Sequence, residues 1–330
     1  MGKWLSFDEK KYLWKDLICS LNQNLAYNCE YWINMKNKNG WECSRLIHFN
    51  NNNQIDAVFV FYSKKSLFFN YHWSPAGLSG LPFEKLEILL VELKLVFYNL
   101  SQLNYLRINN IDEFCSSKNY FLSKYLNRSI VTLSSGFSVK INTDIDSEDL
   151  LKIMSRKRRY TLKESLKNEI NWEFGSSKEI VKKCNDVIEI YKNEKHIKFN
   201  LPQKSELDLI LNDADKKNFI IVGTKNNVPL SMAVIVVSNN QPLYLYAATT
   251  SKGRVLSASY SMVYNLITYL KENNYKNFDF LGISPFDNAV SGIDKFKLAF
   301  GGEIINYNGE WEYGSIISRV IGNLIIYLRK

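Results

Sequence analysis

The chain has 330 residues, of which 46% are hydrophobic and 14% aromatic. This composition is typical of a globular protein and excludes a disordered one, and the length is sufficient for one large core or two ordinary ones. The formal net charge is +9, which favours polyanionic partners such as nucleic acid, anionic lipid or phosphorylated sugars. A Lys- and Asn-rich composition is the alternative explanation of that charge.

Cysteine and histidine are too scattered to indicate a metal site. The five cysteines contain no CxxC pair, and the three histidines are not three or four residues apart. We therefore expect reduced thiols in a cytoplasmic protein without a bound metal or cofactor. The N-terminal residues are too polar for a signal peptide, and no apolar run reaches the ~18 residues that a membrane span needs.

The first half of the chain reads as one α/β unit. A pair of strands, a third strand, an amphipathic helix and a further strand follow one another, with turn residues between them. The strands are expected at 46–49, 57–62, 67–71 and 105–108, and the helix at 83–100.

The second half repeats this order of elements. Strands are expected at 219–223, 232–237, 244–247 and 277–281, with a polar loop at 249–254 and a helix from Ser259 onward. A short helix at 293–299 carries Lys297. We predict two copies of one α/β (α+β) fold with mixed sheets, the first in residues 1–130 and the second in residues 131–330.

Residues 152–167 hold seven basic residues against one Glu. Leu162, Leu166 and Ile170 are four residues apart, which predicts a helix with one buried stripe and a basic remainder. Such charge density suits the phosphate backbone of a nucleic acid, and an ordinary solvated face is the alternative. The candidate nucleic-acid-binding residues are Arg156, Arg158, Arg159 and Lys163.

The segment before the long second-half helix resembles the donor-binding loop of acyltransferases of the GNAT type. Backbone N–H groups at a helix N-terminus bind anions, and the GNAT loop R/Q-x-x-G-x-G/A uses this to hold a pyrophosphate. This chain reads Arg254-Val-Leu-Ser257-Ala-Ser259, with serines in place of the glycines. Arg254, Ser257 and Ser259 are therefore substrate-binding candidates, although the serines crowd the approach of an acyl-CoA.

Two further sequence motifs make the resemblance more specific. Residues 278–283 read FDFLGI and residues 296–302 read FKLAFGG, which resembles the FemABX family. Those tandem-GNAT enzymes transfer amino acids from aminoacyl-tRNA to peptidoglycan precursors. FemAB-like acetyltransferases of polysaccharide gene clusters share the same motifs. The segment 28–41 and the residues YLRI at 105–108 extend the resemblance over nearly the whole chain.

The resemblance assigns roles to individual residues. Lys297 is expected in the substrate channel, where a fixed cation stabilises the negative carbonyl oxygen of acyl transfer by roughly 3 to 4 kcal/mol. Lys36 matches the position that holds a nucleotide-sugar diphosphate. The family's second phosphate ligand is an arginine in R-x-x-F, but this chain has His196 at that place, which argues against a UDP-linked acceptor.

Asp279 is the second catalytic candidate. It lies between two aromatic residues of an expected strand and so points to the opposite face from them. It is expected to orient the attacking amine or to act as a base, with a structural, hydrogen-bonded Asp as the alternative.

Three hypotheses of function follow. The first is aminoacyl-tRNA-dependent transfer to an amine of a cell-envelope precursor. The second is acyl-CoA-dependent N-acyl transfer to a nucleotide- or lipid-linked sugar, and the third is a module without catalysis that binds RNA or a membrane. The serines at 257 and 259 favour the first over the second.

The segment 315–330 is expected to form an amphipathic helix. Its apolar residues recur at helical spacing, and their run of ~14 residues is too short to cross a bilayer. The stripe is expected either to pack on the second domain or to lie on an anionic inner-membrane surface, which would make the cytoplasmic protein a peripheral one.

Overall fold

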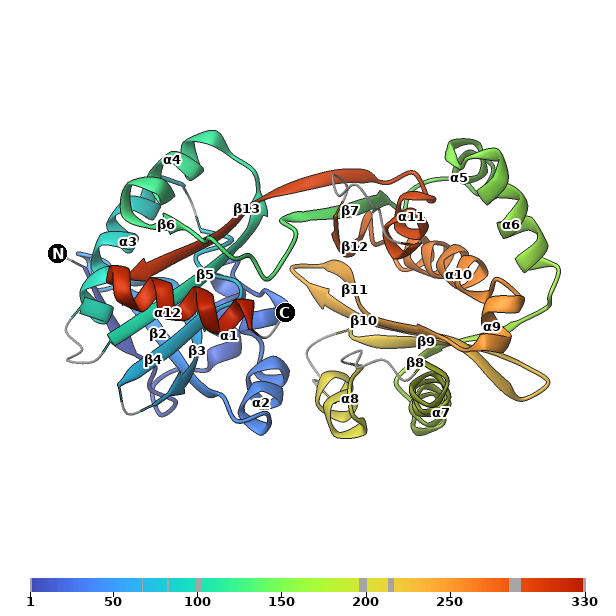
Figure 1. Cartoon of the computed structure of the whole chain (residues 1–330), viewed down its shortest axis with the longest axis horizontal. Coiled ribbons are helices and arrows are strands. Elements are labelled where there is room, and N and C mark those ends of the chain that lie inside the picture. The colour runs from blue at the N-terminus through green and yellow to red at the C-terminus, as the bar shows by residue number, and fades with distance from the viewer. Residues whose placement is uncertain are drawn as a thin grey trace. The chain divides into compact units, whose positions relative to one another are not determined.

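The computed structural model describes residues 2–66, 68–81, 83–98, 103–195, 201–212, 217–284 and 292–328. Two compact units make up the chain (Figure 1). The first contains Met1–Phe137 together with Ile305–Lys330, and the second contains Ser138–Ile304. The predicted boundary after residue 130 assigned residues 305–330 to the second domain, and the structure corrects this.

The first unit is built on a mixed sheet with the order β1-β2-β3-β4-β5-β13. Strands β4 and β5 are parallel and are connected through helix α3, whereas β1 to β4 pair antiparallel in turn, as do β5 and β13. The strands are β1 (Lys3–Ser6), β2 (Glu42–Phe49), β3 (Ile55–Lys65), β4 (Phe69–Ser74), β5 (Leu103–Glu113) and β13 (Glu303–Gly314), and the short β6 (Asn127–Arg128) pairs with β13.

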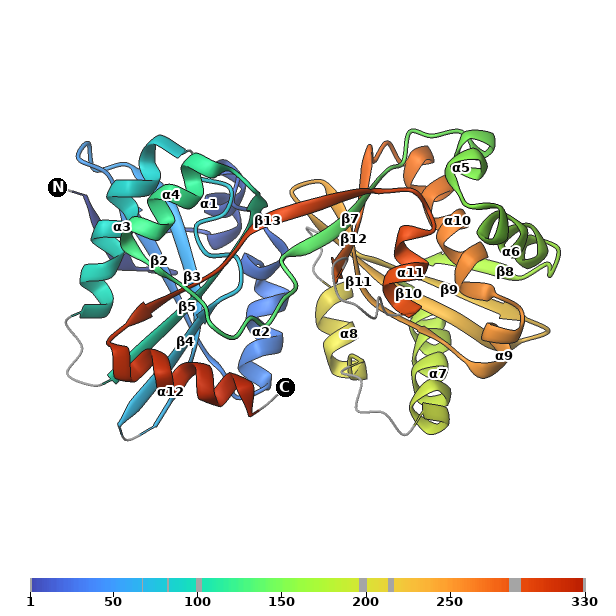
Figure 2. The ribbon, with the colours of Figure 1, turned by 45° about the horizontal axis from the view of Figure 1, so that its top comes forward.

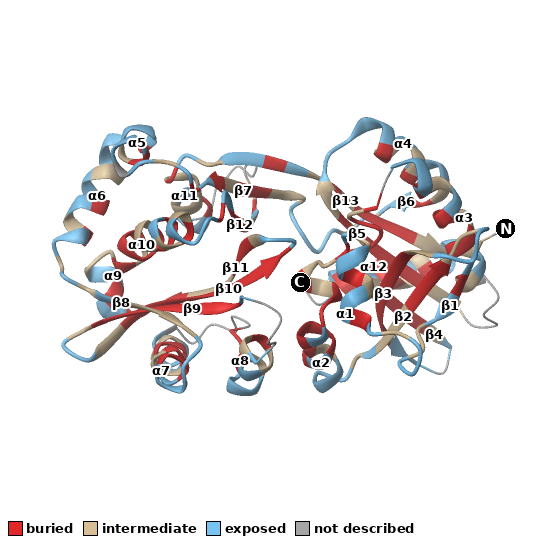
Figure 3. Ribbon diagram, turned by 180° about the vertical axis from the view of Figure 1, so that it is seen from behind, coloured by how far each residue is buried: buried red, intermediate tan, exposed pale blue. Residues whose placement is uncertain are grey.

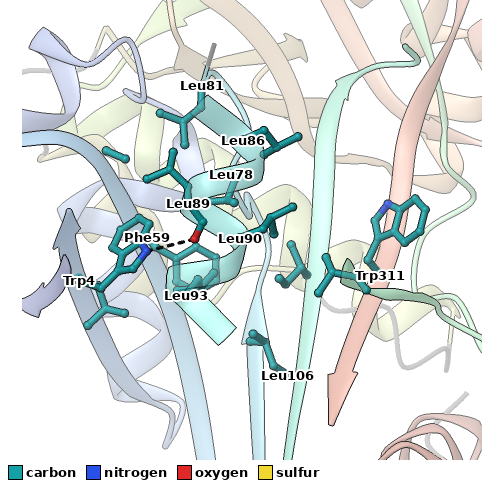
Figure 4. Packing of buried hydrophobic residues seen from close by; sticks show 14 of the residues in the cluster. Trp4, Phe59, Leu78, Leu81, Leu86, Leu89, Leu90, Leu93, Leu106 and Trp311 are labelled. Carbon is teal, nitrogen blue, oxygen red and sulfur yellow. Dashed lines mark hydrogen bonds between the residues drawn. The ribbon is translucent and has the colours of Figure 1, made fainter. Parts of the chain in front are cut away.

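The helices of the first unit lie on both faces of this sheet (Figures 1 and 2). They are α1 (Trp14–Ser20), the 3-10 turn η1 (Ala26–Asn28), α2 (Glu30–Lys38), α3 (Phe83–Tyr98), α4 (Ser116–Tyr125) and α12 (Ile316–Tyr327). On one face, α3 inserts leucines at helical spacing into the main apolar cluster, and the Trp4 indole donates a hydrogen bond to the Leu89 carbonyl at 3.2 Å (Figure 4).

The opposite face of the first sheet carries α12. Alternation along β5 directs Leu106 into the α3 cluster and Tyr105 toward α12. A Cβ at Gly322 would lie 2.6 Å from the Tyr105 ring, so glycine permits this close approach. Ile326 packs in the same small cluster as Tyr105. These contacts and the pairing of β13 with β5 place residues 305–330 with the first unit.

The second unit has a sheet with the order β7-β12-β11-β10-β9-β8. Strands β11 and β12 are parallel, with Leu243 opposite Asp279, whereas β8, β9, β10 and β11 pair antiparallel in turn. The strands are β7 (Phe137–Asn142), β8 (Asn171–Gly175), β9 (Phe219–Lys225), β10 (Val228–Ser238), β11 (Gln241–Thr249) and β12 (Asn277–Ile283).

Helices cover both faces of the second sheet. Helix α10 contacts β9 and β10 and also packs against α6, while α7 contacts β9, β10 and β11 from the other side (Figures 1 and 2). The helices are α5 (Ser147–Ile153), α6 (Arg156–Leu166), α7 (Lys178–Lys195), α8 (Lys204–Leu211), α9 (Ser251–Val255), α10 (Ala258–Glu272) and α11 (Gly292–Leu298).

The two units share one order of elements. In the first, β2, β3 and β4 are followed by α3 and the parallel β5, and in the second, β9, β10 and β11 are followed by α9, α10 and the parallel β12. The prediction of two copies of one mixed α/β fold is confirmed. Two local predictions were wrong: residues 251–255 form helix α9 and not a loop, and the basic segment 152–167 is broken between α5 and α6.

Gly253 sets how closely α9 approaches the second sheet. A Cβ at this position would lie 2.2 Å from the backbone oxygen of Leu230 on β10, a distance that no side chain can tolerate. Thr250 caps α9 by accepting a hydrogen bond from the Gly253 N–H at 3.1 Å. The chain between β11 and α10 is therefore held against the sheet.

We expect Gly253→Ala to lower the free energy of unfolding by roughly 1 to 3 kcal/mol, because the strand backbone cannot move aside without losing hydrogen bonds. Urea unfolding followed by circular dichroism measures the change. Gly292→Ala is the matched control, since a Cβ there has no heavy atom within 4 Å, and alanine favours the helix that begins at this residue. Equal stabilities of Gly253→Ala and the wild type would contradict the close packing of α9.

Candidate active site

The end of β12 has an unusual backbone conformation at Leu281. Its φ is +58°, in the left-handed region that side chains with a Cβ rarely adopt. The Leu281 N–H donates a 2.6 Å hydrogen bond to Oδ1 of Asp279. Ser138 on β7 also donates to this carboxylate, which is only 3% exposed. Asp279 therefore fixes the backbone at the end of the strand.

Lys297 reaches the same turn from helix α11. Its Nζ donates to the backbone oxygens of Leu281 at 3.2 Å and of Gly282 at 2.8 Å. Burial lowers the pKa of this half-buried lysine to about 8, although the carboxylates of Asp294 and Asp279 oppose the shift. The predicted catalytic residues Lys297 and Asp279 thus both bind the backbone of Leu281, Asp279 at its N–H and Lys297 at its C=O.

An aromatic cluster holds α11 in place. Phe296 and Phe300, on either side of Lys297 in the sequence, lie with ring centroids 5.5 Å apart. The Phe296 ring meets Tyr260 of α10 edge-on at 5.2 Å, and Phe280 of β12 lies 5.9 Å from Phe300. Packing of this kind restricts both the rotation of α11 and the direction of the lysine.

Tyr260 also connects the cluster to the basic helix α6. The Arg158 guanidinium donates to the Tyr260 hydroxyl at 2.7 Å, and its carbon lies 5.9 Å from the ring centroid. Burial raises the pKa of Tyr260, and Arg158 opposes that rise. Tyr260 was not predicted as a site residue, because its position on the apolar stripe of α10 resembles that of an ordinary core residue.

Helix α6 presents a basic surface, as the sequence predicted. Arg156, Lys157 and Lys163 are exposed and Leu162 is buried, whereas Leu166 is exposed despite its place in the predicted stripe. Arg159 donates to the backbone oxygens of residues 152 and 154 at 3.4 and 3.2 Å. Arg158 and Arg159 therefore use part of their hydrogen-bonding capacity within the protein.

Residues of the predicted donor-binding loop, 254–259, make hydrogen bonds and an ion pair with other residues of the protein. Arg254 donates to Thr249 O at 2.7 Å and pairs with Glu194 at 3.2 Å. Ser257 has a φ of +52°, and its carbonyl accepts a hydrogen bond from Ser165. Ser259 lies in the first turn of α10. Residues 249–259 thus contain α9 where an acyl-CoA enzyme has an open glycine-lined loop.

Lys36 lies in the first unit, in an aromatic setting. Its Nζ is 4.9 Å from the ring centroid of Trp32 and 5.3 Å from that of Trp73. Within the part of the chain that the structure describes, the buried indole N–H groups of both tryptophans have no hydrogen-bond partner. Two donors beside an ammonium group suit an anion. The other predicted substrate residue, His196, lies outside the described residues.

The described residues offer neither a metal site nor a membrane span. Across the described ranges, no three His, Cys, Asp or Glu side chains are grouped so that they could hold a metal ion. No helix in the same ranges is long and apolar enough to cross a membrane.

Known proteins resemble this chain in sequence and in fold. Residues 178–316 match the FemAB family model. The aminoacyltransferase FemA of Staphylococcus epidermidis is 26% identical over 89 residues, which cover 26% of this chain and 21% of FemA. The chain thus aligns with about a fifth of the length of that relative.

Solved structures extend the likeness to the whole chain. The crystal structure of FemX has a TM-score of 0.74 at 15% identity, covering 98% of this chain and 99% of FemX. A tandem GNAT protein from the clavulanic acid biosynthesis pathway has a TM-score of 0.53 at 7% identity, covering 95% and 98%. The chain is thus similar to the FemAB family over residues 178–316 and to FemX in fold, and its fold is that of tandem GNAT-like units.

Proposed function

We propose that this protein transfers an aminoacyl group from aminoacyl-tRNA to an amine of a peptidoglycan precursor. The observation that carries the proposal is the placement of Lys297 at the end of β12, inside the segment that matches the FemAB family. The FemA relative, an aminoacyltransferase by name, supports the reaction class.

The proposed chemistry is direct aminolysis of the donor ester. The acceptor amine attacks the ester carbonyl, the C–N bond forms, and the C–O bond to the tRNA ribose breaks as the amine loses a proton. Negative charge develops on the carbonyl oxygen, and an ammonium group fixed beside it contributes roughly 3 to 4 kcal/mol. Lys297 supplies that group, because at a pKa of about 8 it is mostly protonated at neutral pH.

Asp279 has a positioning role in this proposal. Its carboxylate is buried and accepts hydrogen bonds from Ser138 and from the Leu281 N–H. A base needs to reach the proton that it removes, whereas Asp279 binds the N–H of Leu281, the residue whose carbonyl oxygen binds Lys297. We therefore assign it to the orientation of Lys297 and not to proton transfer.

The assignment of aminoacyl-tRNA as the donor rests on the basic surface of α6 and on the contacts that residues 249–259 make within the protein. The exposed basic residues of α6 suit the phosphates of tRNA, which bind through charge and with little dependence on sequence. Arg254, the residue that would approach a CoA pyrophosphate, is paired with Glu194. The side-chain contacts of residues 249–259 thus favour aminoacyl-tRNA over acyl-CoA.

The acceptor assignment rests on Lys36 and its two tryptophans. The two buried indole N–H groups have no hydrogen-bond partner among the described residues, and the positive charge of Lys36 lies close to both rings. We propose that they bind a phosphate of the precursor.

Replacing Lys297 tests its role as a cation. We expect Lys297→Ala to lower kcat at least about tenfold, because the charge that stabilises the carbonyl oxygen is lost. Lys295→Ala removes an exposed lysine from the same helix and should leave kcat unchanged. Transfer of labelled amino acid from charged tRNA measures both. Equal turnover by Lys297→Ala and the wild type, with equal melting temperatures, would contradict the proposal.

The pH dependence of kcat distinguishes a cation from a base. The ammonium form of Lys297 exists below its pKa, so the wild-type kcat should fall, relative to Lys297→Arg, as the pH rises through about 8. Arginine stays charged over this range and should show no such fall. A relative rate that instead rises through pH 8 would identify Lys297 as a base.

The basic surface of α6 is tested by salt-dependent tRNA binding. In the triple variant Arg156→Gln, Lys157→Gln, Lys163→Gln, the slope of log affinity against log salt should decrease by roughly 0.7 to 0.9 for each phosphate that the variant no longer neutralises. The matched control removes Lys182, Lys192 and Lys204, exposed residues of α7 and α8 on the other face of the sheet. A wild type that binds no tRNA but consumes acetyl-CoA with an acceptor would reject the tRNA assignment.

A further inference from the structure

Helix α12 presents its apolar side chains to the solvent. The sequence predicted that these residues face a core or a membrane surface, and in the structure they are exposed, unlike the buried strands of the first sheet (Figure 3). Their exposed fractions are large: Ile316 73%, Ile317 62%, Val320 59%, Leu324 53%, Tyr327 67% and Leu328 74%. An exposed apolar stripe of this size is a mark of an interaction surface.

The opposite side of α12 is buried, and it makes polar contacts in addition to the packing of Ile326 and Gly322 on Tyr105. The Asn323 amide donates to Oε2 of Glu312 at 2.7 Å and accepts from the Val131 N–H at 3.0 Å. Glu312 is fully buried, and Arg319 lies 3.7 Å from its other oxygen. Rolling the helix to bury its isoleucines would leave this carboxylate without those partners, which is costly inside a protein. The outward direction of the stripe is therefore fixed by the sheet beneath it.

The sequence of this part of the chain is basic and not acidic. Residues 315–330 include three basic side chains and no acidic one, and the neighbouring segment 129–136 has no charged residue at all. That segment adds Ile130 and Leu133, which are 77% and 47% exposed. A second copy of this chain would bring the same positive charge to the interface, whereas an anionic lipid surface is complementary to it.

We propose that α12 binds an anionic lipid surface, lying in the plane of the interface with its apolar side toward the acyl chains. Its 12 residues are too few to cross a bilayer, and an apolar stripe in a segment with basic but no acidic residues is typical of helices that lie in the interface. The inference does not rest on the transfer reaction, because binding is measured without donor or acceptor.

Flotation of the full chain with vesicles tests the proposal. We expect binding to vesicles of phosphatidylglycerol and phosphatidylcholine, weaker binding to phosphatidylcholine alone, and a decrease with added salt. The variant Ile317→Gln, Leu324→Gln should bind the anionic vesicles at least about tenfold more weakly, because two apolar side chains no longer enter the lipid.

The matched control is Ile88→Gln, Leu95→Gln on α3. These residues are 59% and 54% exposed, close to the 62% and 53% of Ile317 and Leu324, so both variants remove the same apolar groups. Each should melt like the wild type, and only the α12 variant should lose binding. Absent binding to anionic vesicles, or equal binding by the α12 variant, overturns the proposal. A lipid-independent dimer that the α12 variant dissociates would identify a second copy as the occupant, and would also overturn it.

Discussion

The hydrogen bond from the Leu281 N–H to Asp279 is the interaction on which the candidate active site depends. Holding a leucine in the left-handed region costs roughly 1 to 2 kcal/mol. A hydrogen bond to a charged acceptor contributes about 1.5 to 3 kcal/mol, which is enough to offset that cost. The turn directs the Leu281 carbonyl to Lys297, and without it the ammonium group would lose one of its two backbone acceptors.

The two units share one order of elements, but different side chains pack at the corresponding positions. In the first, the helix between the parallel strands is α3, whose leucines fill an apolar cluster. In the second, the corresponding connection contains α9 and α10, and the far end of β12 is covered by Phe296 and Phe300 with a lysine between them. The second unit therefore holds a half-buried lysine within an aromatic cluster.

Sequence periodicity predicted the elements that depend on neighbours along the chain. The order of strands and helices in both units and the basic face of α6 follow from local pattern. The features that periodicity did not predict depend on contacts between residues that are far apart in the sequence. The segment 305–330 returns to the first unit because β13 pairs with β5. Arg254 is neutralised by Glu194, and the apolar stripe of α12 faces outward because Glu312, buried below it, binds Asn323.

In the candidate site, too, the residues of local motifs were predicted from the sequence, whereas the features that depend on long-range contacts were not. Lys297 and Asp279 were identified from two short motifs, and the structure places both at the turn that ends β12. The positive φ of Leu281 has no signal in the sequence, since glycine or asparagine is the usual residue in that conformation. Tyr260 resembled a core residue, and its contact with Arg158 joins helices that are remote in the sequence.

The lowered pKa of Lys297 bears on how such a site favours a transition state over a bound substrate. Burial removes water from the ammonium group, and two carbonyl oxygens replace it only in part. A cation in this condition gains more from a nearby negative charge than a fully hydrated one does. In the proposed reaction, the carbonyl oxygen of the ester is nearly neutral and acquires its charge only as the amine adds. The attraction is therefore weak in the ground state and strong in the transition state, which is the requirement for a faster chemical step.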